Sequence, residues 1–144
     1  MKSSNKIGVN ILEKIDYILA GIGAIIGYFL GGLDQLLTVF AVIFVIDTIS
    51  GIIKANINGT YSSKGFRNGI LNKCGYILAI ILVVQLDKLF GNTGALRSAL
   101  LFCFIYNEGV SVVENLGEMG VPIPKAITNA LEVLHKKSEE SEDK

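Results

Sequence analysis

The sequence predicts an all-α membrane protein: a bundle of four short transmembrane helices followed by an amphipathic helix on the cytoplasmic side. The 144-residue chain is 51% hydrophobic and 18% charged, with a mean hydropathy of +0.53. An average soluble domain carries about 25% charged residues. Apolar segments recur along the chain, and basic residues gather between them. The length suits one domain, so we treat residues 1–144 as a single membrane domain.

The ionisable residues exclude several classes of function. Thirteen basic and thirteen acidic residues cancel, which argues against a nucleic-acid partner. Cys74 and Cys103 lie in or beside apolar segments and are interpreted as reduced, small hydrophobic residues. The single histidine, His135, has no Cys or His nearby to share a metal. Glu108 and Glu114 have no nucleophile or phosphate-binding loop around them. We therefore expect no enzyme, no metal and no cofactor.

The first predicted span covers residues 17–33, which carry no charge. Gly23, Gly27 and Gly31 recur every fourth residue, and such a stripe lets another membrane helix approach closely. The alternative is that glycine is simply common in membrane helices. Residues 1–16 mix charged and apolar residues, as in an interfacial helix. A signal peptide is the other interpretation, but no clean cleavage site follows.

The second predicted span covers residues 36–53 and contains an acid. Asp47 and Ser50 share one face of a helix with Lys54. A carboxylate at the centre of a membrane helix costs about 2.5–3.5 kcal/mol on insertion scales. We predict that Asp47 meets a buried partner or faces a pore. The alternative is a hydrated position near the interface.

Residues 54–73 are predicted to form a cytoplasmic loop. They contain four basic residues and no acid, and short cytoplasmic loops concentrate Lys and Arg. The four are Lys54, Lys64, Arg67 and Lys73.

Two further spans are predicted, at residues 74–90 and 95–113. If the chain crosses the membrane four times with both termini in the cytoplasm, only Lys88 and Arg97 of the thirteen basic residues fall outside. A three-span arrangement strands either the basic loop or the basic C-terminal segment on the wrong side.

The fourth span ends in a half-polar segment. Helical spacing puts five of its residues on one face, as candidates to line a pore or to pair within the bundle: Asn107, Glu108, Ser111, Glu114 and Asn115. A turn follows, built from Gly120, Pro122 and Pro124. Residues 125–137 are predicted to form the amphipathic helix, and residues 138–144 a disordered tail.

The chain resembles the toxin-secretion and phage-lysis holins, which include phage holin family 4 and the holin-like proteins of clostridial toxin loci. Two blocks carry the resemblance. One runs over residues 47–73, and the other is YNEGVSVVENLGEMGVPIP at residues 106–124. The resemblance implies a multi-pass protein of the bacterial plasma membrane. Such proteins oligomerise in the lipid bilayer and form pores that release an endolysin or a large toxin. The alternative is a non-lytic membrane channel subunit or scaffold.

Overall fold

The structure is a computed structural model that describes residues 3–91 and 93–142, with side chains for 13–91 and 93–137. The described residues form five α-helices and no strand. In chain order the helices are α1 (Ser3–Leu30), α2 (Gln35–Ile57), α3 (Ser63–Leu89), α4 (Ala95–Glu118) and α5 (Lys125–Glu142). The prediction of an all-helical protein is confirmed.

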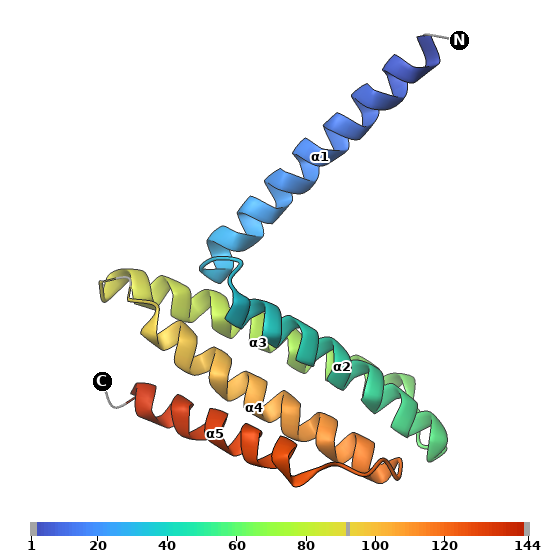
Figure 1. The fold of residues 1–144 in the computed structure, drawn as a ribbon, viewed down its shortest axis with the longest axis vertical. Coiled ribbons are helices and arrows are strands. Elements are labelled where there is room, and N and C mark those ends of the chain that lie inside the picture. Colours follow the sequence, from blue (N-terminus) through green and yellow to red (C-terminus); the bar gives the residue numbers. More distant parts are fainter. Residues whose placement is uncertain (1–2, 92, 143–144) are drawn as a thin grey trace.

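Helix α4 is the centre of the bundle. It packs against α2, α3 and α5, whereas α1 meets the bundle mainly through α3. Figure 1 shows α2 to α5 running roughly along one direction, with α1 projecting away from them. Because α4 is central, its side chains contact three other helices, and polar side chains from α2 and α3 meet those of α4.

The core is apolar and small. Phe104 of α4 stacks on Tyr76 of α3 at 4.3 Å between ring centroids, and it lies 6.0 Å from the ring of Phe40 of α2. These aromatic contacts join the three helices at one level of the bundle. The buried apolar cluster is Leu37, Phe40, Ile80, Val84, Leu101, Phe104 and Ile105.

The outward faces of α2 and α3 are apolar as well. Val42 is 53% exposed, and Leu78 is 66% exposed. Helices α2, α3 and α4 are each long and apolar enough to cross a membrane, which suggests a membrane protein with these outer faces against lipid. Helix α1 is not among the three. Its charge-free helical part, residues 17–30, extends only about 21 Å at 1.5 Å per residue, against a hydrocarbon core of about 30 Å.

Several helix boundaries differ from the sequence-based expectation. Helix α2 continues to Ile57, and α3 already begins at Ser63, so most of the basic stretch 54–73 is helical. Ser62 caps α3 by accepting a hydrogen bond from the Gly65 amide at 3.0 Å, which satisfies a backbone donor of the first turn. Helix α5 continues to Glu142 through most of the segment expected to be disordered; residues 143–144 lie outside the described part.

Candidate functional site

A cluster of polar side chains lies inside the bundle, where α2, α3 and α4 meet. The Lys73 ammonium is 3.1 Å from Asp47 Oδ2 and also forms an ion pair with the Glu108 carboxylate. The three side chains are only 12%, 13% and 7% exposed. Asn115 donates to Asp47 Oδ1 and to Ser50 Oγ, both at 3.1 Å. We call these five residues the polar network.

Helical spacing positions the members of the network. Asp47 and Ser50 are one turn apart on α2, and the Ser50 hydroxyl donates to the Asp47 carbonyl at 3.0 Å. Glu108 and Asn115 are two turns apart on one side of α4. The Phe44 ring lies 4.3 Å from Lys73 Nζ, and an aromatic face attracts a cation. Each charge therefore has a partner from a different helix or turn.

The network joins three helices by charge pairing. Buried carboxylates are tolerated only when they are paired and hydrogen-bonded, and here two of them share one ammonium. Among the residues that the structure describes, no three His, Cys, Asp or Glu side chains are arranged to hold a metal ion. This arrangement can bind the three helices to one another and hold charged groups inside an apolar bundle.

A cleft leads to the network between the C-terminal half of α2 and the N-terminal half of α3. It has a volume of about 250 Å³, and Asp47 and Lys73 both line it. Gly51, Gly69 and Ser62 are among the small residues that line it. A space of this size can accommodate several waters, each of which occupies about 30 Å³ in the liquid.

The predicted polar face of α4 divides into two parts. Glu108 and Asn115 are buried in the polar network. Asn107 and Glu114 are exposed, and Ser111 is half-buried. The helical spacing grouped all five residues on one face of α4, but the core of the bundle contacts only the edge of that face that carries Glu108 and Asn115.

The four basic residues assigned to the cytoplasmic loop have different surroundings. Lys54 pairs with Glu118 at 3.3 Å, near the end of the bundle. Lys64 and Arg67 are exposed on the first turns of α3. Lys73 belongs to the polar network, which the sequence interpretation missed. The signal in the sequence was the position of Lys73 at the start of an apolar run.

The glycines of the first predicted span have no common packing partner. Among the described residues, a Cβ built on Gly23 meets nothing within 4 Å, and one on Gly27 meets only Leu33. Gly31 lies beyond the end of α1 with a positive φ of 78°. A Cβ there would come within 2.8 Å of Arg97 Cδ and 2.9 Å of Val84 Cγ2. Gly31 therefore permits a close approach between the α1–α2 turn and α4.

The predicted turn of Gly120, Pro122 and Pro124 lies between α4 and α5. Gly120 has a positive φ of 80°, which suits glycine directly after a helix. Pro122 and Pro124 follow, and the Pro124 carbonyl accepts a hydrogen bond from the Ile127 amide at 3.0 Å. The turn folds α5 back along α4 (Figure 1).

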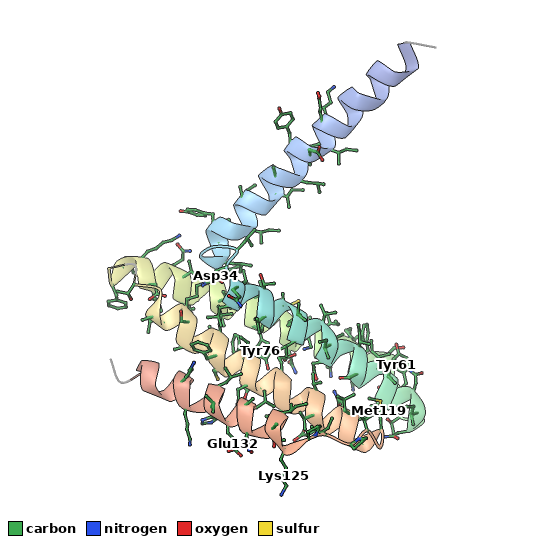
Figure 2. All side chains as sticks on the ribbon, in the orientation of Figure 1. Asp34, Tyr61, Tyr76, Met119, Lys125 and Glu132 are labelled. Atoms are coloured by element: carbon green, nitrogen blue, oxygen red, sulfur yellow. The ribbon has the colours of Figure 1, made fainter. Side chains whose placement is uncertain are left out.

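A second polar cluster lies at the opposite end of the bundle, and the sequence did not reveal it. The Arg97 guanidinium donates to the Leu30 carbonyl at 2.6 Å, to the Gly32 carbonyl at 3.1 Å and to Asp34 Oδ2 at 2.7 Å. The Asp87 carboxylate accepts from the Arg97 backbone amide at 2.9 Å. Figure 2 labels Asp34 where α1 joins the bundle. This cluster ties the end of α1 to α3 and α4.

The Arg97 hydrogen bond holds the pKa of Asp34 below its ordinary value of 3.8, and the Leu37 amide adds to this effect. A lowered folded-state pKa contributes stability that is complete above the unfolded pKa and is lost as the pH falls through the folded one. We therefore expect the apparent unfolding temperature in detergent to decrease as the pH falls below about 4. Asp34→Asn should remove this part of the pH dependence. An unchanged profile in the variant would contradict the assignment.

Comparison with known proteins identifies the family. Residues 24–136 match the bacteriophage holin family, a range that contains all three apolar helices and most of α5. The chain belongs to this family. A probable holin of Bacillus phage phi105 is 32% identical over 116 residues, covering 81% of this holin-family chain and 86% of the relative. The resemblance stated from the two sequence blocks is thereby confirmed.

Two other relatives of this holin-family chain are uncharacterized proteins. An uncharacterized protein of Listeria monocytogenes is 33% identical over 126 residues, which is 88% of this chain and 90% of the relative. An uncharacterized 14.9 kDa protein from the nagH 3′ region of Clostridium perfringens is 34% identical, covering 89% and 98% respectively. No solved structure matches the chain.

Proposed function

We propose that the chain is a holin: it oligomerises in the bacterial plasma membrane and forms pores through which an endolysin or a large toxin leaves the cell. The match of residues 24–136 to the bacteriophage holin family carries this proposal, because it includes α2, α3 and α4, the three helices that are long and apolar enough to cross a membrane. The relative from phage phi105, a probable holin, supports the lytic role.

The two polar regions of α4 suggest how one chain serves both the folded bundle and the pore. Glu108 and Asn115 pair inside the bundle and hold three helices together. Asn107 and Glu114 point outward from the same helix. An outward carboxylate on a spanning helix is costly against lipid, but it is tolerated against a protein partner or a water-filled cavity. Oligomerisation removes such residues from lipid.

We further propose that α1 is a short fourth span and that both termini are cytoplasmic. Apart from Lys88 and Arg97, this arrangement keeps the basic residues inside. A reporter that is active only in the cytoplasm should therefore work at either terminus, and a periplasmic reporter should work only between α3 and α4 or at the α1–α2 turn. If the N-terminal fusion is active outside and the C-terminal one inside, the chain crosses three times.

Inducible expression in bacteria tests the function. Membrane potential and release of a cytosolic enzyme are followed with and without a co-expressed endolysin. A holin should depolarise the membrane abruptly and release the enzyme only when the endolysin is present. Depolarisation without release indicates a small channel, and a well-inserted protein that does neither is a scaffold.

Glu114→Gln is expected to change the time of onset or the conductance, since this exposed carboxylate would meet the lumen or a neighbouring subunit. The matched control is Glu118→Gln, because Glu118 lies one turn further along α4 and already pairs with Lys54. Glu108→Gln should also shift the onset, through the polar network. Unchanged lysis in the Glu114 and Glu108 variants at normal protein levels would refute these roles.

A further inference from the structure

Helices α4 and α5 each carry an exposed polar stripe with the same spacing. Residues at i, i+4, i+7 and i+11 fall on one side of a helix. The α4 stripe is Asn107, Ser111, Glu114 and Glu118, and the α5 stripe is Lys125, Asn129, Glu132 and Lys136. All eight side chains are exposed except Ser111, which is half-buried. Figure 2 shows Lys125 and Glu132 on the outer side of α5.

Contacts between α4 and α5 hold the two helices at a defined register. The Leu131 side chain packs against Gly109, where a Cβ would come within 2.5 Å of Leu131 Cδ2. The Tyr106 and His135 rings are 4.7 Å apart, one turn further along. The two helices lie side by side and run in opposite directions (Figure 1). Helix α5 is thus docked along a helix long and apolar enough to span a membrane.

This position places charged residues of α5 level with the middle of α4. Glu132 follows Leu131, which is level with Gly109 near the middle of α4, and Lys136 lies one turn beyond it. Each such charge costs about 2.5–3.5 kcal/mol at the centre of a bilayer if it faces lipid. The α5 stripe must therefore face a protein or water.

In the same register, residues of the α4 stripe lie at the same height along the bundle as residues of the α5 stripe. Because the helices are antiparallel, a step toward the C-terminus of α4 corresponds to a step toward the N-terminus of α5. Starting from Gly109 and Leu131, Ser111 is level with Asn129, to within about a turn. The neighbouring positions pair Glu114 with Lys125 and Asn107 with Glu132. Each pair is a charge pair or can form a hydrogen bond.

The stripes cannot meet within one chain. At 3.6 residues per turn, Asn107 and Glu114 lie about 140–160° around α4 from Gly109, the residue that contacts α5. By the same count Lys125, Asn129 and Glu132 lie about 100–160° around α5 from Leu131. The two stripes therefore point away from each other, on opposite sides of the α4–α5 pair.

We propose that the α4 stripe of one copy binds the α5 stripe of the next, with Glu114 against Lys125, Ser111 against Asn129 and Asn107 against Glu132. Rotation about the membrane normal preserves depth, so residues that are level in one chain are level between chains. Two different surfaces that join head to tail generate a ring when the rotation closes. The inference rests on the proposed holin function, which requires an assembly, and it names the surfaces that build it.

Disulfide crosslinking between two differently tagged chains tests the interface. Both chains carry Cys74→Ala and Cys103→Ala; one adds Ser111→Cys and the other Asn129→Cys. We expect heterodimers on oxidation in membranes, and dimers from neither chain alone. A single chain with both cysteines should give a ladder of oligomers. The matched control pairs Ser111→Cys with Lys136→Cys, which lies about 10 Å further along α5, beyond the reach of a disulfide.

Charge reversal adds an independent readout. Glu114→Lys in the Ser111→Cys chain and Lys125→Glu in the Asn129→Cys chain should each abolish the heterodimer crosslink between positions 111 and 129, and the two reversals together, one in each chain, should restore it. Crosslinking of Ser111→Cys chains to one another, or no crosslink in an inserted protein that depolarises cells, overturns the interface while the holin function stands. An intact crosslink in a protein that never depolarises cells overturns the holin function and leaves the interface.

Discussion

Lys73→Met is expected to lower the free energy of unfolding of the bundle by about 3–5 kcal/mol, because it leaves the carboxylates of Asp47 and Glu108 buried without a counter-ion. Thermal unfolding in detergent, or resistance to unfolding by SDS, measures the effect. Lys64→Met is the matched control on the same helix. Lys64 is exposed, so its replacement should change stability by no more than about 0.5 kcal/mol.

A triple variant separates charge from packing. Lys73→Met combined with Asp47→Asn and Glu108→Gln removes all three charges, and neutralised buried clusters are often as stable as charged ones. We expect this protein to recover most of the lost stability. If Lys73→Met unfolds no more easily than Lys64→Met, the polar network does not hold the helices together.

Arg97→Met is expected to cost about 3 kcal/mol and to loosen α1 from the bundle. The guanidinium is buried and donates to the Leu30 and Gly32 carbonyls and to the half-exposed Asp34 carboxylate, and a buried acceptor that loses its donor costs about 1–3 kcal/mol. Proteolysis at the α1–α2 turn, together with unfolding in detergent, measures the change.

Lys88→Met provides the control at the same end of the bundle. Lys88 is exposed, and its ammonium lies 4.1 Å from the centroid of the Tyr28 ring, a contact worth about 0.5–1 kcal/mol at such a site. Equal protease sensitivity of the two variants would mean that Arg97 does not fasten the α1–α2 turn.

Hydropathy and helical spacing predicted the helices themselves, because long charge-free runs have few alternatives to helix. They located the ends poorly where a helix leaves the apolar region. The first half of α3 is polar and was expected to be loop, but Ser62 supplies a cap that starts the helix there. Composition alone does not separate a polar helix from a polar loop.

The candidate site was only partly visible in the sequence. Asp47 and Glu108 stood out as acids within apolar runs, whereas Lys73 was assigned to a loop because basic loops are common on the cytoplasmic side. Helical periodicity states which residues of one helix share a side. It does not state which neighbour covers that side, so the pairing of residues from three helices appeared only in the folded bundle.

The projection of α1 has a consequence for which residues of the chain can be replaced without loss of stability. The described side chains of residues 13–22 are exposed, and the family match begins only at residue 24, within α1. The first part of α1 therefore lies outside both the packed core and the range of the family match. Because these side chains are exposed, their replacement should change the stability of the remaining four helices by no more than about 0.5 kcal/mol.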